Sequence, residues 1–309
     1  MTTFFISHPA CLEHTNPPGH PERADRLRAI EHVLNRERFQ FLNRKLAPLA
    51  SYDTIALCHS EHEIAEIRHL APKHGFVQID SDTSMSPGSL EAMLRSAGGA
   101  IAATDAVMTG GAANAFVATR PPGHHAESQR PMGFCFFNNV AIAARYAQRR
   151  YGIARAAVVD FDVHHGNGTQ DIFWADPTVM YCSTHEMPLY PGTGAISERG
   201  ERDTIVNAPL RAGDAGAQFR EAFESKILPR LKSFAPELLL ISAGFDAHYR
   251  DPLANLNLEA EDYRWVTQKL MDVADANAQG RIVSVLEGGY DLQGLAESVD
   301  AHVTALMRG

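Results

Sequence analysis

The chain has 309 residues, a length that fits one large domain or two modest ones. Because 45% of the residues are hydrophobic and 21% are charged, the chain can bury a substantial core, and a disordered chain is excluded. The formal net charge of −9 argues against nucleic acid as a direct partner, since proteins that bind nucleic acids usually present a basic surface.

Short apolar runs alternate with amphipathic segments along the chain. In chain order, we predict strands at 3–7, 115–119, 156–159, 179–183, 238–242 and 282–286, and helices at 21–36, 87–108, 138–150, 213–233, 259–278 and 292–307. This alternation predicts a mainly parallel sheet with helices on both faces. No linker interrupts the pattern, so we expect one domain over residues 1–309.

Four widely spaced cysteines indicate a reducing environment. Cys11, Cys58, Cys135 and Cys182 form no Cys-x-x-Cys pair, so we expect free thiols that serve as small core residues. No Lys or Arg precedes the apolar N-terminal stretch, which disfavours a secretory signal. No apolar run approaches the ~20 residues that a membrane-spanning helix needs. We therefore expect a soluble protein of the cytoplasm that contacts no membrane.

Polar or glycine-rich clusters follow five of the predicted strands. They are Arg120-Pro-Pro-Gly-His-His125, Asp160-Phe-Asp-Val-His-His-Gly-Asn-Gly168, Thr184-His185, Ala243-Gly-Phe-Asp246 and Glu287-Gly-Gly-Tyr290. Parallel α/β sheets bind ligands at the carboxyl ends of their strands, so the shared placement predicts one composite site. The long stretches 185–213 and 245–258 follow strands of that site, and we expect them to be functional loops.

The residues Asp162, His164 and Asp246 form the best metal-binding set. Alternate residues of a strand point the same way, so Asp160, Asp162 and His164 converge on one face if the strand geometry persists. Carboxylate and imidazole suit zinc, and three protein ligands leave positions open for water and substrate, as in catalytic zinc sites. Capping of turns or helices would also account for each aspartate taken alone.

Two further clusters offer acid–base chemistry. His124 and His125 are costly to desolvate, and we interpret them as an acid–base pair, although they could also be metal ligands. Tyr290 follows two glycines, and its hydroxyl could approach an oxyanion, with ordinary packing as the alternative. No Gly-x-Ser-x-Gly motif occurs, and the apolar neighbours of Cys135 would raise its pKa. We therefore expect a metal-bound water to be the attacking group.

Histidines outside these clusters are not predicted to be metal ligands or acid–base groups. Strand alternation points His165 away from His164, so we expect His165 to be hydrogen-bonded inside the protein. His59, His62 and His69 are expected to be solvated positions on helices.

Six motifs in this order resemble the histone deacetylase family, and the likeness runs from His20-Pro-Glu to the C-terminal helix. They are Arg120-Pro-Pro-Gly-His-His-Ala126, Gly133-Phe-Cys-Phe-Phe-Asn-Asn139, Asp160-Phe-Asp-Val-His-His-Gly-Asn-Gly168, Tyr190-Pro-Gly-Thr-Gly194, Ser242-Ala-Gly-Phe-Asp246 and Glu287-Gly-Gly-Tyr-Asp291. The resemblance implies the arginase/deacetylase fold, a single α/β domain around a largely parallel eight-stranded sheet with helices on both faces. It implies zinc-dependent removal of an acetyl or other acyl group from the ε-amino group of lysine or of a similar small amine.

The resemblance also implies roles for individual residues. One zinc ion per chain would be held by Asp162, His164 and Asp246. The tandem histidines would be His124 and His125, with His125 the general base and then the general acid. Asp160 would partner His124, Asn167 would partner His125, and Tyr290 would hydrogen-bond the substrate carbonyl. The remaining matches are channel walls at Gly133, Phe134, Tyr190 and Leu253, an internal cavity at Arg26, and a structural potassium ion near Asp160, Asp162, His164, Ser183 and Thr184.

Two departures from the family pattern refine the assignment. Asn167 stands where the class I branch has an aspartate, which makes the chain look like the class II branch and its bacterial amidohydrolases. A neutral amide should raise the pKa of His125 less than a carboxylate would. Tyr190 replaces the more usual phenylalanine of the channel wall and adds a hydroxyl.

Three other functions were weighed against the acyl-lysine deacetylase. Ureohydrolases share the fold but need two manganese ions, and Gly166 and His248 stand where the second ion would need carboxylates. Deacetylases of acetylpolyamines remain the alternative, but they place an acidic gatekeeper where this chain has Leu253. A metal-bearing binding module would need a lost catalytic group, and none is lost.

Overall fold

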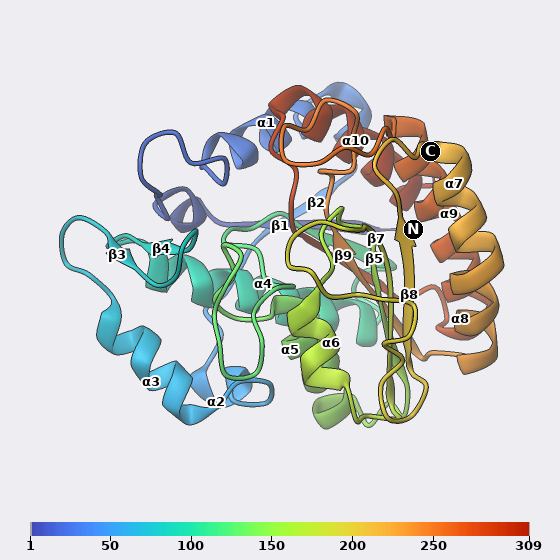
Figure 1. Cartoon of the computed structure of the whole chain (residues 1–309), viewed down its shortest axis with the longest axis horizontal. Coiled ribbons are helices and arrows are strands. Elements are labelled where there is room, and N and C mark those ends of the chain that lie inside the picture. The colour runs from blue at the N-terminus through green and yellow to red at the C-terminus, as the bar shows by residue number, and fades with distance from the viewer. Residues whose placement is uncertain (1, 309) are drawn as a thin grey trace.

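An eight-stranded sheet forms the centre of the protein (Figure 1). The structure is a computed structural model and describes residues 2–308. The strands lie in the order β2-β1-β5-β10-β9-β6-β7-β8, and every neighbouring pair in this sheet is parallel. Their bounds are β1 (Thr3–Ser7), β2 (Asn43–Leu46), β5 (Asn114–Val117), β6 (Ala156–Asp160), β7 (Val179–Glu186), β8 (Ile205–Leu210), β9 (Leu238–Ala243) and β10 (Ile282–Leu286). A separate antiparallel hairpin consists of β3 (Val77–Gln78) and β4 (Ser84–Met85).

Helices cover both faces of the sheet, with α4 and α5 on one side and α7 to α10 on the other (Figure 1). The α-helices are α1 (Asp25–Leu34), α2 (Tyr52–Ile55), α3 (Glu61–Leu70), α4 (Ser89–Met108), α5 (Asn139–Tyr151), α6 (Asn167–Phe173), α7 (Gly216–Ala222), α8 (Leu228–Phe234), α9 (Ala260–Asn277) and α10 (Leu292–Leu306). Two 3₁₀-helices, η1 (Pro9–Leu12) and η2 (Glu37–Phe39), and a π-helix, η3 (Phe223–Ile227), complete the elements.

The central strands are buried on both faces, which explains their continuous apolar runs. All six residues of β9 and all five of β10 are buried. Alternate residues serve opposite cores, so that Val158 packs with α4 and α5 while its neighbour Val159 packs with α1, α9 and α10. The helices begin and end at residues that favour these positions. The Asn138 side chain caps α5 by accepting a hydrogen bond from the Ala141 amide at 3.0 Å, and Gly152 ends it at a φ of +67°.

The six predicted strands and the predicted mainly parallel sheet are confirmed, but the β3–β4 hairpin and two strands of the main sheet were not predicted. These two strands are β2 and β8, which form the two edges of the main sheet. The four residues of β2 are all exposed, and β8 contains Asn207 and Pro209, so neither has the apolar run of a central strand. The prediction that 185–213 is irregular was therefore wrong in part, because it contains β8.

The predicted helices are confirmed with shifted bounds, and one of them is interrupted. The segment predicted as a single helix at 213–233 consists of α7, the π-helix η3 and α8. The helix predicted from residue 21 begins at Asp25, after an irregular segment that reaches the site. Helices α2 and α6 were not predicted, and for α3 only the helical positions of His62 and His69 were expected, without bounds. Among the described residues, no helix combines the length and apolar character required to cross a membrane.

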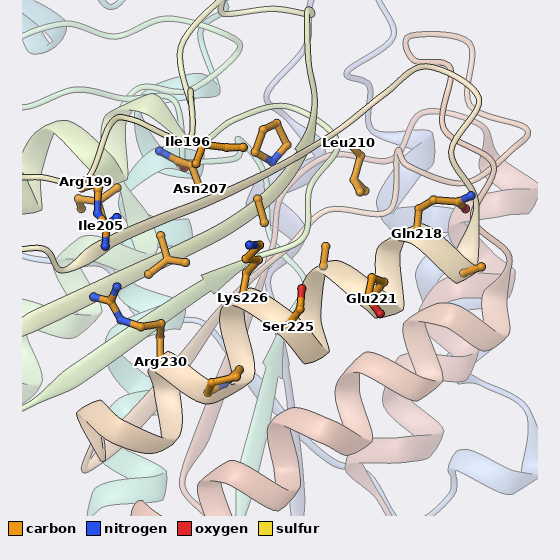
Figure 2. A pocket seen from close by; sticks show the side chains of 16 residues that line it. Ile196, Arg199, Ile205, Asn207, Leu210, Gln218, Glu221, Ser225, Lys226 and Arg230 are labelled. Atoms are coloured by element: carbon orange, nitrogen blue, oxygen red, sulfur yellow. The ribbon is translucent and has the colours of Figure 1, made fainter.

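A groove of about 850 Å³ lies between the edge strand β8 and the helices α7 and α8 (Figure 2). Side chains of both elements line it, including Asn207 from β8 and Glu221, Lys226 and Arg230 from the helices. None of the residues that the sequence predicts for catalysis lines this groove, so the size of a hollow does not locate the candidate site.

Candidate metal and acid–base site

The candidate site begins where β6 ends. The strand stops at Asp160, so the strand geometry on which the expected convergence of Asp160, Asp162 and His164 depended does not persist. A turn held by side chains takes its place. Asp160 Oδ1 accepts a hydrogen bond from the Asp162 amide at 3.1 Å, and Asp162 Oδ1 accepts one from the His164 amide at 2.9 Å. These two hydrogen bonds, rather than the geometry of a strand, bring the side chains of Asp162 and His164 together.

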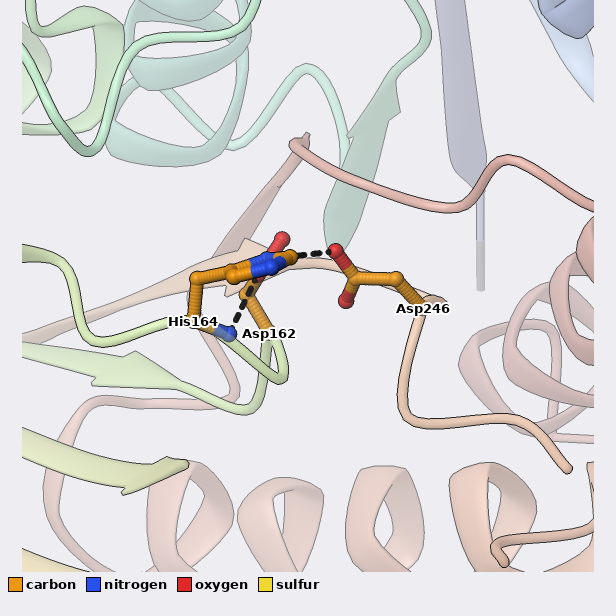
Figure 3. Close-up of side chains that lie close together, drawn as sticks. All are labelled: Asp162, His164 and Asp246. Atoms are coloured by element: carbon orange, nitrogen blue, oxygen red, sulfur yellow. Dashed lines mark hydrogen bonds and ion pairs between the residues drawn. The ribbon is translucent and has the colours of Figure 1, made fainter. Parts of the chain in front are cut away.

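Asp246 meets this turn from the end of the neighbouring strand β9 (Figure 3). The ligand atoms of Asp162, His164 and Asp246 all lie within 4.8 Å of one another, and the three residues are buried. Backbone amides fix the carboxylates, because Asp246 Oδ1 accepts from the Val163 amide at 2.9 Å and Asp162 Oδ2 from the Gly288 amide at 2.8 Å.

The spacing of these atoms fits a small divalent cation. His164 Nδ1 lies 3.3 Å from Asp162 Oδ1 and 3.1 Å from Asp246 Oδ2. A tetrahedral ion with bonds of about 2.0–2.1 Å separates its ligands by roughly 3.3 Å. Burial, followed by the charge of Asp162, raises the pKa of Asp246, so a further positive charge beside this carboxyl would favour its ionised form. A cation between the three side chains would supply it.

His124 is held beside the metal-binding set as a charged group. Its Nδ1 lies 3.0 Å from Asp160 Oδ2, which also accepts a hydrogen bond from the Tyr181 hydroxyl at 3.1 Å. Burial would lower the pKa of His124, but the carboxylates of Asp162 and Asp160 outweigh it and raise the pKa to about 10. A side chain at Gly166 would collide with Asp160 and come within 3.1 Å of His124 Nδ1, so this close arrangement requires glycine.

His125 is instead held as a neutral base. Its Nδ1 lies 2.8 Å from Asn167 Oδ1, while Asn167 Nδ2 donates to Glu127 Oε1 at 2.7 Å. The amide oxygen therefore faces His125, which places the proton on Nδ1 and leaves the Nε2 lone pair free. Burial, followed by the charges of His124 and His164, lowers the pKa of His125 well below its usual value.

Tyr290 follows the end of β10, the strand next to β9 in the sheet. Its ring packs edge-on against Phe134 with the centroids 5.9 Å apart, and the Arg26 guanidinium carbon lies 4.9 Å from the centroid of the Tyr290 ring. Burial raises the pKa of Tyr290 well above its ordinary value, so its hydroxyl keeps a proton to donate at neutral pH.

Three of the four predicted channel residues, Gly133, Phe134 and Tyr190, lie against His125 or Tyr290. The Tyr190 ring lies 5.2 Å from the His125 ring, and Phe134 follows Gly133 in a turn where both residues have positive φ. A side chain at Gly133 would stand 2.6 Å from His125 Cδ2, so glycine lets the wall approach the base. Leu253 is half-buried in the loop after β9, where its amide donates to Asp251 Oδ1 at 3.1 Å.

A buried ionic network behind the site was missed in the sequence. The predicted cavity residue Arg26 is fully buried and donates to the carbonyl oxygens of Glu287 and Gly289. Its other partner is Glu22 Oε1 at 3.2 Å, and Glu22 also binds Arg120 through both carboxylate oxygens. The only signal in the sequence was that Glu22 and Arg120 belong to motifs, and no periodicity marks a buried acid.

Glu287 is a second acid that was missed as a structural link. Its Oε2 accepts from the amides of Gly123 at 2.7 Å and His124 at 3.1 Å, and its Oε1 accepts from Ser242 Oγ at 3.1 Å. Glu287 thereby ties the ends of β5, β9 and β10 together. Burial raises the pKa of Glu287 to about 7.

The residues expected near a potassium ion lie on β6, the turn after it, and β7. Asp160 is in register with Ser183 across the β6–β7 pair. Ser183 Oγ lies 2.8 Å from His185 Nδ1, whereas Thr184 Oγ1 is buried without a hydrogen-bond partner among residues 2–308.

The lesser histidines behave differently from one another. His165 is buried and hydrogen-bonds Thr193 and Gln170, as predicted. His62 and His69 are exposed, as predicted, but the prediction for His59 was wrong. His59 is 3% exposed and accepts a hydrogen bond from the Asn138 amide at 2.8 Å, because it precedes α3 and faces α5.

Residues 20–306 match the family model of the histone deacetylase domain. The chain belongs to the histone deacetylase family. It is 38% identical over 317 residues to a probable deacetylase of Archaeoglobus fulgidus, with 100% of this chain and 87% of that protein covered. It is 38% identical over 290 residues to the histone deacetylase-like amidohydrolase of Pseudomonas aeruginosa, covering 93% of this chain and 75% of that protein.

The fold agrees with that membership. The crystal structure of the HDA15 HD domain superposes with a TM-score of 0.94 at 33% identity, covering 100% of this chain and 89% of the other. Histone deacetylases are in general zinc-dependent hydrolases of acetylated substrates, so this chain is an enzyme of the deacetylase and amidohydrolase type.

Proposed function

We propose that this protein removes an acetyl or other acyl group from the ε-amino group of lysine in a peptide or protein, or from a similar small amine. The observation that carries the proposal is one arrangement of side chains. A buried set of two carboxylates and an imidazole lies beside a histidine whose Nε2 is free to accept a proton, and the protonated Tyr290 follows the end of the nearby strand β10.

The metal of this proposal is a single zinc ion held by Asp162, His164 and Asp246. When bound, zinc would polarise the substrate carbonyl and activate a water for attack. A structural potassium ion near Ser183 and Thr184 is part of the same proposal, and the unpartnered Thr184 Oγ1 supports it. The cytoplasm is the proposed location, in keeping with the four free, buried cysteines.

The side chains of this chain would move the protons and hold the substrate. His125 Nε2 would take the proton of the attacking water and then give a proton to the departing amine, while Asn167 keeps the His125 ring oriented. His124 would supply a fixed positive charge beside the reacting carbonyl. Tyr290 would donate a hydrogen bond to the oxygen that becomes negatively charged.

The narrow walls favour an extended acyl-lysine chain over a charged polyamine. Phe134 and Tyr190 offer aromatic faces to an alkyl stem, and Leu253 offers no charge to a distal ammonium. Burying an ammonium without compensation is costly, so acetyl-lysine peptides should be better substrates than acetylspermidine. Deacetylation of acetylpolyamines is the alternative that the experiment must separate.

The test is a turnover screen of the zinc-loaded protein on acetyl-lysine peptides, acetylpolyamines and other acylated small amines. We expect the peptides to have the higher kcat/KM. We also expect chelation to abolish turnover, zinc or cobalt to restore it, and elemental analysis to give one transition metal per chain. A strong preference for acetylpolyamines would overturn the substrate assignment, and two transition metals per site would overturn the single-ion assignment.

A further inference from the structure

A buried aspartate in the loop after β9 holds two parts of the candidate site together. Asp251 is 7% exposed. Its Oδ2 accepts hydrogen bonds from the amides of Tyr290 at 2.7 Å and Asp291 at 3.3 Å, and its Oδ1 accepts from the Leu253 amide at 3.1 Å. One carboxylate therefore fixes both the backbone of the tyrosine and the turn that carries the half-buried leucine.

The loop that contains Asp251 is itself anchored to the fold. The Asp251 amide donates to the His248 carbonyl at 2.8 Å. On the other side of Leu253, Asn255 donates through its backbone to Glu186 Oε2 at 2.7 Å and through its side chain to Glu186 Oε1 at 2.8 Å. Because Glu186 is the last residue of β7, the carboxylate of Asp251 is a fixed point against which the Tyr290 segment can be set.

Capping of helix α10 does not account for this carboxylate. The helix already has its own cap, since Asp291 Oδ1 accepts from the Gly294 amide at 2.7 Å. The shorter of the bonds from Oδ2 goes to Tyr290, which precedes the helix. Tyr290 also follows Gly289, whose φ of +124° belongs to a conformation that side-chain-bearing residues rarely adopt. A segment with that freedom needs an external bond to keep Tyr290 in one place.

We propose that Asp251 is a positioning residue that holds the Tyr290 hydroxyl at the place where the substrate carbonyl reacts. Asp251 acts through the backbone of Tyr290 and does not touch the substrate. The same carboxylate sets the turn of Leu253, so the depth of the channel wall and the position of the tyrosine are linked. This inference rests on the proposed deacetylase function.

The central experiment is a double-mutant cycle of Asp251→Ala and Tyr290→Phe. Alanine has no side-chain acceptor, so it removes the bonds to the Tyr290, Asp291 and Leu253 amides together. We expect Asp251→Ala alone to lower kcat by about 10- to 100-fold on an acetyl-lysine peptide, which is less than loss of the hydroxyl itself. In the Tyr290→Phe background, the same substitution should change kcat less than about twofold, because the group that it positions is already absent.

A matched control is Asp176→Ala. Asp176 also accepts a backbone hydrogen bond, from the Thr178 amide at 2.7 Å, but it lies before β7 at the opposite edge of the sheet from the site. Its substitution should leave kcat and KM unchanged. Equal fold losses from Asp251→Ala in both tyrosine backgrounds, or an unchanged kcat in the single variant, would overturn the proposal.

Hydrogen–deuterium exchange provides a readout that needs no turnover. The Tyr290 amide should exchange at least about tenfold faster in Asp251→Ala than in the wild type, while amides within α10 from Leu295 onward keep their protection. Unchanged exchange at Tyr290 would overturn the positioning role. If the wild type deacetylates none of the substrates, the proposed function fails, and this exchange measurement still decides whether Asp251 holds the tyrosine segment.

Discussion

The buried network behind the site makes Glu22→Gln a demanding test of the structure. Glu22, Arg26 and Arg120 are each 0% exposed, and one carboxylate faces two guanidinium groups. Glu22 Oε1 accepts from both arginines, and Oε2 accepts from Arg120 at 2.6 Å. Glutamine keeps the shape of the side chain but replaces one carboxylate oxygen with an NH₂ group. That hydrogen-bond donor then faces an N–H donor of an arginine.

The expected cost follows from the contacts that are lost. One or two hydrogen bonds to the arginines disappear, depending on which oxygen is replaced, each contributing about 1.5–3 kcal/mol, and the bonds that remain lose the charge of the carboxylate. That sum agrees with the roughly 3–5 kcal/mol by which removing one partner of a buried ion pair destabilises a protein. For a chain of this length, about 2 °C of Tm corresponds to each kcal/mol, so Tm should fall by about 6–10 °C.

The assay measures thermal unfolding by circular dichroism, with Glu31→Gln as the control, because Glu31 lies in helix α1, shortly after Glu22 in the chain. Glu31 pairs with Arg44 at 2.9 Å, but both side chains are more than a third exposed, so its loss should cost less than about 1 kcal/mol. Burial would raise the pKa of Glu22, but Arg120 and His14 outweigh it and hold the pKa well below its usual value. Both folded and unfolded Glu22 are then ionised near neutrality, so the Tm difference should be constant there and shrink only in acid.

A loss of stability below about 1 kcal/mol for Glu22→Gln would refute this reasoning, because it would mean that water reaches the two guanidinium groups or that they do not depend on the carboxylate. Turnover offers a second check. Arg26 binds the carbonyls of Glu287 and Gly289 on either side of Gly288, so disturbing its charge partner should also lower kcat.

Three further predictions concern single side chains. Tyr290→Phe should lower kcat by ~10²–10³-fold, roughly 2.7–4 kcal/mol, with zinc content unchanged, and a near wild-type kcat would show that the hydroxyl has no catalytic role. Leu253→Glu should shift the ratio of kcat/KM from acetyl-lysine peptide toward acetylspermidine, and an unchanged ratio would count against the gatekeeper role. The carboxyl oxygens of Glu63 have no hydrogen-bond partner within residues 2–308, and burial raises its pKa to about 8, so wild-type stability should fall as pH rises from the ordinary pKa of 4.5 to 8. Relative to the wild type, Glu63→Gln should therefore be stabilised by about 1–2 kcal/mol more at about pH 8.5 than at about pH 5.5, as measured by the free energy of unfolding in urea; this value allows for screening by nearby solvent. The same free-energy difference at both pH values would contradict the burial argument.

The strands that could be predicted most directly from the sequence are those whose residues are all buried. Strand β9 is apolar along its length because both its faces are covered, so its pattern could be read directly. Strand β8 sits at the edge with a proline and an asparagine, and its place is set by pairing with β7, which no local pattern records. The bend of 213–233 at the π-helix η3 is likewise a product of packing.

The candidate site could be predicted where chemistry is concentrated in short motifs. Asp162 and His164 were found from their spacing, although a turn rather than a strand brings them together. Asp251 was passed over, because its role depends on the amide of Tyr290, 39 residues away. Acids that act by accepting backbone hydrogen bonds across long separations leave no local signature.

The hydrogen bonds at the first residues of β1 and β5 have a practical consequence for handling the enzyme. Thr3 Oγ1 donates to the Leu306 carbonyl at 3.3 Å, and Asn114 Nδ2 donates to the same oxygen at 2.9 Å. Both ends of the described chain thus lie at the amino edge of the sheet, whereas Asp162 and Asp246 lie beyond the carboxyl ends of their strands. A bead, surface or carrier protein tethered at either end would stand on the side away from the reacting groups, so immobilisation through the termini should leave the approach of substrate open.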